Sequence, residues 1–128
     1  MLAPVRELAY VIILCDDIGR MKAFYRNLLP FEVDSESETS LSLRAGGVLL
    51  GLRQRTRGYD GVGARQESPG LQLAFRVEPE QVEPCHEQLV AMGVTVLEPT
   101  TDQWRGHRTV YFADPEGDRK STRLNSSH

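Results

Sequence analysis

Some segments of the chain have the apolar pattern of a strand, and others have apolar residues every three to four positions, as in a helix. The same order of segments occurs twice. The first half opens with an apolar run, Leu8–Leu14, which predicts a strand. Apolar residues then recur every three to four positions, so we expect a helix over Asp17–Leu29 with Asp16 or Asp17 as its N-cap. Pro30 ends this helix. The strands expected next begin at Phe31–Val33 and continue at Ser40–Arg44 and Val48–Arg53.

The second half repeats this order after a Gly-containing linker, Gln54–Pro69. Alternation predicts a strand over Leu71–Val77, and a helix follows over roughly Glu80–Met92. Pro84 fits this helix only in its first turn, and Gly93 is expected to end it. Helical spacing predicts a buried face made of Val82, Cys85, Leu89 and Met92. The remaining expected elements are a strand at Val94–Leu97, a strand at Thr109–Phe112 and a turn at Ala113–Gly117.

The two halves differ at the end of the second one. Gly47 aligns with Gly117, but VLLGL follows the first glycine and DRKST follows the second, so we expect the second half to lack its last strand. The segment Asp118–His128 agrees residue by residue with the in-frame translation of a widely used sequencing-adapter oligonucleotide. We therefore predict that this segment is not native and set it aside. Without it the net charge changes from −3 (15 basic, 18 acidic side chains) to −5 (12 basic, 17 acidic).

Composition and charge narrow the classes of function. The 128 residues suit one domain, and we expect a cytoplasmic protein because the chain has neither a membrane-length apolar run nor a basic-then-apolar leader. The negative net charge argues against a nucleic-acid partner. Cys15 and Cys85 form no disulfide framework, so we expect reduced, buried thiols. The basic cluster is interpreted as a solvated linker; its members are Arg53, Arg55, Arg57 and Arg65.

The motifs CDDIGRMKAFYRNLLPFEV, GVTVLEP, DQWRGHR and FADPEG together resemble the vicinal-oxygen-chelate superfamily, which includes glyoxalase I, extradiol dioxygenases, and fosfomycin- and bleomycin-resistance proteins. The resemblance covers Leu8–Gly117. It implies an α+β fold of two tandem βαβββ modules, about 5–53 and 70–117, joined by the linker 54–69 within one domain at 1–117. Such modules curve around a cavity. We expect Phe24 and Tyr25 to pack between helix and sheet.

The resemblance also implies where a metal would be held. Members that use a divalent ion place ligands on the first and last strands of each module, which here correspond to Tyr10, Gly51 and Gln72, with the fourth position beyond Gly117. A phenol, a glycine and an amide are a poor ligand set, so we expect no cofactor. The alternative is a divalent metal (Zn, Ni, Fe or Mn) in a glyoxalase-type lyase or isomerase or an extradiol dioxygenase. The histidines are interpreted as surface or loop residues, with His86 on the solvent side of its helix and His107 near a cavity mouth.

Without a metal, the same cavity is expected to bind a small hydrophobic or aromatic molecule, as drug-sequestering members of the superfamily do. The candidate ligand-binding residues are Tyr10, Gln72, Trp104, Arg108 and His107. Trp104 offers a rigid stacking face, although it could equally anchor its own loop, and Arg108 could pair with a ligand anion. We expect a homodimer without nucleic-acid or membrane partners. A partner or regulatory module that binds no ligand is the third hypothesis.

Overall fold

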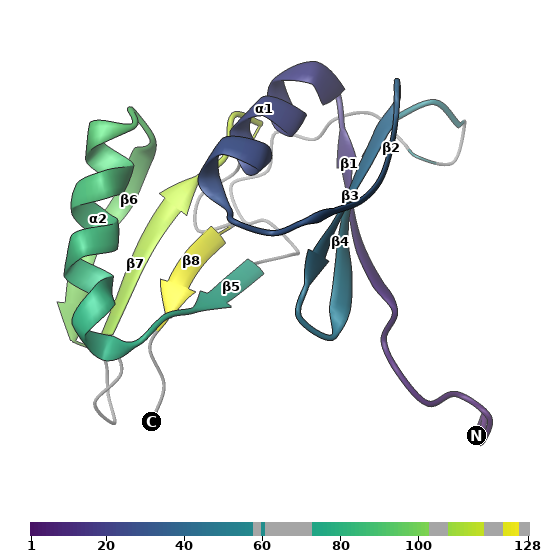
Figure 1. Cartoon of the computed structure of the whole chain (residues 1–128), viewed down its shortest axis with the longest axis horizontal. Coiled ribbons are helices and arrows are strands. Elements are labelled where there is room, and N and C mark those ends of the chain that lie inside the picture. Colours follow the sequence, from purple (N-terminus) through teal and green to yellow (C-terminus); the bar gives the residue numbers. More distant parts are fainter. Residues whose placement is uncertain (58–59, 61–72, 103–107, 117–121, 126–128) are drawn as a thin grey trace. The chain divides into compact units, whose positions relative to one another are not determined.

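The computed structural model of the protein describes residues 1–57, 60, 73–102, 108–116 and 122–125. The chain divides into two compact units, Met1–Gly63 and Ala64–His128. Each unit holds a four-stranded sheet and an α-helix (Figure 1). The expected α+β fold class is therefore confirmed.

The first unit follows the order strand, helix, strand, strand, strand. Its elements are β1 (Tyr10–Cys15), α1 (Ile18–Leu28), β2 (Val33–Ser37), β3 (Ser40–Ala45) and β4 (Val48–Gln54). In the sheet the strands lie in the order β1-β4-β3-β2, with β4 parallel to β1 and antiparallel to β3. The chain reaches this arrangement because α1 carries it back across the sheet between β1 and β2, as a parallel pairing requires.

The core of this unit lies between the sheet and α1. One face of the sheet is buried; its side chains are Cys15, Leu41, Leu43, Leu50 and Leu52. From α1, Met21 and Tyr25 are buried against them, and the Phe24 ring meets the Tyr25 ring edge-on at 5.0 Å. The expected packing of Tyr25 is confirmed. Each such apolar side chain contributes about 1.5–3 kcal/mol when fully buried.

Helix α1 begins where the sequence predicts. The Asp17 carboxylate accepts a hydrogen bond from the Arg20 backbone N–H at 3.1 Å, which makes Asp17 rather than Asp16 the N-cap. Such a bond satisfies one of the donors that the first helical turn leaves without a partner. On the outer side of the helix, Lys22 and Arg26 pair with Glu36 of β2, and the hydrogen bonds from Arg26 and Lys22 lower the pKa of the Glu36 carboxyl.

The second unit has the same kinds of element. They are β5 (Leu73–Arg76), a 3₁₀ turn η2 (Pro79–Gln81), α2 (Val82–Ala91), β6 (Thr95–Asp102), β7 (Arg108–Ala113) and β8 (Thr122–Asn125). The strands lie in the order β5-β8-β7-β6, and α2 runs alongside β6 and β7 (Figure 1). Val110 and Phe112 of β7 are fully buried. Among the described residues, no helix reaches the length and hydropathy of a membrane-spanning segment.

Helix α2 follows its sequence prediction in part. Pro84 does lie in the first turn, and Gly93 ends the helix with φ +76°, a left-handed conformation that glycine adopts without steric cost. Val82 and Leu89 are buried as expected, and Cys85 is half-buried. The prediction for Met92 was wrong, because its side chain is 50% exposed. Met92 is the C-cap, where the helix stops and its periodicity no longer directs a side chain to the sheet.

The expectation that the second half lacks its last strand was also wrong. Strand β8, at Thr122–Asn125, lies between β5 and β7, parallel to the first and antiparallel to the second. The sequence prediction rested on the polar character of this segment. A strand ladder is built from backbone groups, however, and two flanking strands with open N–H and C=O groups can be paired by a segment of weak apolar pattern.

Removing the α1 cap should destabilise the first unit. We expect Asp17→Ala to lower the free energy of unfolding by about 0.5–2 kcal/mol, because the Arg20 N–H loses its acceptor. Asp17→Asn keeps a side-chain oxygen in place and should stay within about 0.5 kcal/mol of the original protein. Urea unfolding followed by circular dichroism measures both. Equal losses in the two variants would contradict the capping role.

Candidate functional site

The face of the first sheet turned away from α1, called here the helix-free face, carries the side chains that alternate with the core positions. The strand register arranges nine of them in three cross-strand rows: Tyr10, Leu49 and Arg44; Ile12, Gly51 and Ser42; Leu14, Arg53 and Ser40. Paired residues of neighbouring strands point to the same side, so each row forms a continuous strip across β1, β4 and β3. Apolar side chains therefore gather on β1 and β4, and hydroxyls on β3.

Two large apolar side chains of β1 stay open on this face. Tyr10 and Ile12 are each 50% exposed, although the strand that carries them is part of a packed unit. Single exposed apolar residues are ordinary on protein surfaces, but adjacent ones beside a depression are typical of a binding surface. The helix-free face is therefore the candidate functional site of the first unit.

Gly51 allows Ile12 to lie across the centre of the face. A Cβ placed on Gly51 would come within 3.3 Å of Ile12 Cγ1, a contact closer than ordinary van der Waals distance. The two residues are direct partners in the β1–β4 register. The absence of a side chain at position 51 thus creates the space that the isoleucine side chain fills.

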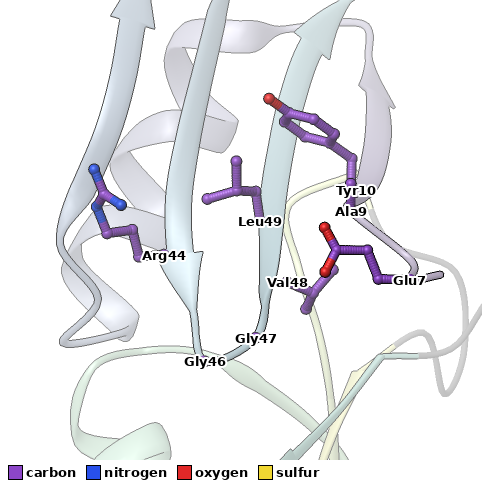
Figure 2. Close-up of a pocket in the computed structure, with 8 residues that line it drawn as sticks. All are labelled: Glu7, Ala9, Tyr10, Arg44, Gly46, Gly47, Val48 and Leu49. Atoms are coloured by element: carbon purple, nitrogen blue, oxygen red, sulfur yellow. The ribbon is translucent and has the colours of Figure 1, made fainter.

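A pocket of about 320 Å³ opens at one end of the helix-free face, beside the β3–β4 turn (Figure 2). Its lining residues are Glu7, Ala9, Tyr10, Arg44, Gly46, Gly47, Val48 and Leu49. The first cross-strand row forms its wall, with the Tyr10 ring on one side, Leu49 in the middle and Arg44 on the far side (Figure 2). This volume lies at the lower end of the range of about 300–1,000 Å³ for small-molecule sites.

Charged groups stand on opposite sides of this pocket. The Arg44 guanidinium forms an ion pair with Asp34 Oδ1 at 3.0 Å, and the Arg44 side chain is still more than half exposed. Glu7 lies on the other side, three residues before Tyr10 in the chain (Figure 2). An aromatic ring, an aliphatic floor and charges of both signs can orient an amphiphilic small molecule.

The other end of the helix-free face is closed by a buried ion pair. Asp60 accepts two parallel hydrogen bonds from the Arg53 guanidinium, at 2.8 and 3.0 Å, and two more at 3.0 Å from the backbone N–H groups of Thr56 and Arg57. The Arg53 hydrogen bonds, with those of the two backbone groups, hold the pKa of the Asp60 carboxyl well below its usual range. Asp60 is one of the few buried charged residues described.

The same segment is tied to the start of α1. Gln54 donates to the Asp16 carbonyl oxygen at 2.8 Å and accepts from the Ile18 N–H at 3.1 Å. Arg55 pairs with the Asp16 carboxylate at 3.2 Å and donates to the Asp60 carbonyl oxygen. Arg53 and Arg55 are therefore structural, and their interpretation as part of a solvated linker was wrong. Arg65 lies outside the described residues.

The structure describes some of the predicted site residues and not others. Tyr10 lies on the helix-free face and in the pocket, and Gly51 lies on the same face, diagonally across from Tyr10 on the neighbouring strand. Arg108 begins β7 in the second unit, where its register partner is Asp102. Three predicted residues fall outside the described residues: Gln72, Trp104 and His107.

Sequence reasoning missed the residues whose roles depend on long-range pairing. Arg44 and Leu49 become neighbours of Tyr10 only through the β1–β4–β3 register, and nothing local marks Asp60 as the partner of Arg53. The alternation of Ser40–Ala45 did indicate that Arg44 points away from the core. It could not indicate which strand lies beside it.

In the described part of the second unit, polar groups tie its elements together. His86 Nδ1 lies 2.9 Å from Thr100 Oγ1 and accepts from the Thr100 N–H at 3.4 Å, which ties α2 to β6. The prediction that His86 faces solvent was wrong, because the side chain is mostly buried against this strand. Burial raises the pKa of the Cys85 thiol, so the reactive thiolate form is disfavoured.

The two family-equivalent metal positions of the first unit supply at most one ligand atom. Of the two metal-equivalent positions in this unit, Tyr10 offers a single phenol oxygen and Gly51 has no side chain, with Ile12 filling the space above it. A bound catalytic ion usually takes three or more protein ligands. In the described ranges no group of three or more His, Cys, Asp or Glu residues comes together.

Comparison with known proteins gives a family match over most of the chain. The model of the Glyoxalase/Bleomycin resistance protein/Dioxygenase superfamily matches residues 7–119. A relative, the metallothiol transferase FosB of Staphylococcus saprophyticus, is 25% identical over 113 residues, which cover 88% of this chain and 73% of that protein.

Solved structures with the same fold include two with a high TM-score. The fosfomycin resistance protein FosX from Listeria monocytogenes has a TM-score of 0.75 at 20% identity, over 97% of this chain and 95% of its own. A glyoxalase/bleomycin resistance protein/dioxygenase family enzyme from Burkholderia phytofirmans PsJN has a TM-score of 0.76 at 24% identity, over 94% and 98% of the two chains. At these identities the likeness establishes the fold alone.

The Asp60 ion pair should make stability depend on pH. A carboxyl whose pKa is lowered by folding stabilises the protein above its unfolded pKa of about 3.9, and this contribution is lost as the pH falls further toward the folded pKa. We therefore expect the difference in urea midpoint between the original protein and Asp60→Asn to be constant from pH 7 to about 5 and to shrink below about pH 4.

The matched control is Glu38→Gln, which changes an exposed residue in the β2–β3 turn. Its difference in urea midpoint from the original protein should not shrink below about pH 4. A difference between the original protein and Asp60→Asn that stays unchanged down to pH 3 would contradict the ionised Arg53–Asp60 pair.

Proposed function

Since the chain belongs to the Glyoxalase/Bleomycin resistance protein/Dioxygenase superfamily, we propose that it is a small-molecule binding protein that acts without a resident metal. The ligand is a hydrophobic or aromatic molecule held on the helix-free face, as in sequestration of an antibiotic. The protein acts as a homodimer, without a nucleic-acid or membrane partner.

The observation that carries this proposal is the Gly51–Ile12 contact. By the resemblance, position 51 is one of the four places where a metal-binding member can carry a ligand, and here it has no side chain. Its space is taken by an apolar side chain that is itself half exposed toward the open face. Apolar surface therefore lies where a metal-ligand atom would be, and this favours binding of an apolar molecule.

The surrounding residues suit binding and orientation. Tyr10 supplies a half-exposed ring for stacking and a hydroxyl that can donate or accept one hydrogen bond. Leu49 and Ile12 supply apolar contact in the two adjoining rows, and Ser42 completes the middle row with a hydroxyl. Ligand contacts by Gln72, Trp104, His107 and Arg108 stay predictions.

A metal-dependent transferase is the second candidate, favoured by the match to a metallothiol transferase over 88% of the chain. In this case the metal would depend on residues other than the first-unit positions discussed above. The reaction class would be transfer of a thiol to a small electrophile, as the name of that relative implies.

Binding of an aromatic antibiotic should be independent of metal and dependent on Tyr10. We expect metal-free bleomycin, titrated against the intrinsic fluorescence of the single tryptophan, to bind with the same affinity before and after exhaustive dialysis against EDTA. Tyr10→Ala should weaken binding about tenfold, because the stacking face is lost. Val90→Ala truncates another exposed apolar side chain, far along the sequence on α2, and should not change the affinity. Absence of saturable binding would overturn the proposal.

The second candidate makes the opposite prediction about metal. Fosfomycin incubated with the protein, a low-molecular-weight thiol and Mn²⁺ would be consumed, as followed by phosphorus NMR, and EDTA would stop the reaction. From the donor atoms of Tyr10 and Gly51 we expect no consumption above the rate without protein. Chelator-sensitive turnover would replace the binding proposal with the enzymatic one.

A further inference from the structure

The pocket beside the β3–β4 turn has an uneven distribution of charge, and we infer from it that the ligand of the helix-free face carries an organic cation. This inference rests on the proposed function and names the chemical class of its ligand: an amphiphile with an apolar ring and an ammonium-type group. The cation lies on the side of the pocket that Glu7 and Tyr10 line, and the apolar part lies over Leu49 and Ile12.

The positive charge of the pocket is already offset. Arg44 forms its ion pair with Asp34 at 3.0 Å, and Asp34 is mostly shielded from solvent in this contact. A ligand anion would therefore have to share the guanidinium with a carboxylate that is held in place by the strand beside it. An anionic ligand gains little from such a pair.

The negative charge of the pocket is not offset in the same way. Glu7 lines the pocket and makes no ion pair with any residue in the part of the chain that the structure describes. It precedes β1, while Arg44 lies on β3, and β1 and β3 are two strand spacings or about 10 Å apart. That distance is about one Debye length at physiological salt, so Arg44 repels a cation beside Glu7 only weakly.

The Tyr10 ring adds a second attraction for a cation. Tyr10 is half exposed and lines the same side of the pocket as Glu7, across from Arg44 (Figure 2). An aromatic face attracts an organic cation through the electrons of the ring, and a nearby carboxylate strengthens the same preference. The net charge of −3 for the whole chain favours the approach of cations over that of anions.

Three single-ring probes that differ in charge test the inference: benzyltrimethylammonium, benzyl alcohol and benzenesulfonate. Binding is followed by the ¹H–¹⁵N NMR shifts of the pocket amides of Gly46, Gly47, Val48 and Leu49. At low salt we expect the cation to bind about three- to tenfold more tightly than the neutral probe, and the anion to bind most weakly. Added salt should reduce the advantage of the cation.

Glu7→Gln should remove most of the preference for the cation while leaving the affinity for benzyl alcohol within about twofold. Glu38→Gln, which removes a negative charge at the β2–β3 turn outside the pocket, should keep the preference. If benzyl alcohol or benzenesulfonate shifts these amides at least as strongly as the cation, the inference is overturned while small-molecule binding at the face stands. If no probe shifts them, the inference is likewise overturned, and the bleomycin titration decides separately whether the proposed function survives.

Discussion

Strand β4 is paired on both sides, parallel to β1 and antiparallel to β3, and this double pairing fixes the direction of every side chain in the first sheet. Leu50 and Leu52 point to α1 and complete the core, so Leu49, Gly51 and Arg53 must point the other way. A slip of one residue would bury Arg53 and expose both leucines, which explains why the register is strongly specified. The pocket, the apolar rows and the Arg53–Asp60 pair all follow from this single alternation.

The two ends of the helix-free face are built differently, and the difference bears on what the face can do. At one end Asp60 has its carboxylate fully engaged by Arg53 and two backbone N–H groups, and Gln54 and Arg55 tie the same segment to the start of α1. A charge held in this way is rigid and has no capacity left for a ligand. At the other end Glu7 and Tyr10 remain open. Ligand binding is therefore expected at the open end, while the closed end holds the sheet and helix in place.

Periodicity predicted the elements well because each depends on local pattern. The helix α1, an aspartate cap at position 16 or 17, the buried Tyr25 and the glycine that ends α2 were all predicted from spacing and residue type. The predictions that failed concern contacts that residue spacing alone does not encode. The Arg53–Asp60 pair, the contact of His86 with Thr100 and the strand β8 are each made by tertiary pairing, which overrides local polarity. That Asp118–His128 is the translation of an adapter sequence stays a prediction. The backbone pairing of β8 does not depend on where its side chains come from.

Family membership establishes the fold of this protein, but its activity depends on a few side chains. The relatives matched here include a metallothiol transferase, so the fold itself is compatible with metal chemistry. Whether a given chain performs it depends on side chains such as those at positions 10 and 51. Positions 12 and 51 are coupled, because a Cβ at position 51 would lie 3.3 Å from Ile12 Cγ1. A side chain at position 51 would require Ile12 to shift by a few tenths of an ångström, so the effects of substitutions at positions 12 and 51 are expected not to be additive.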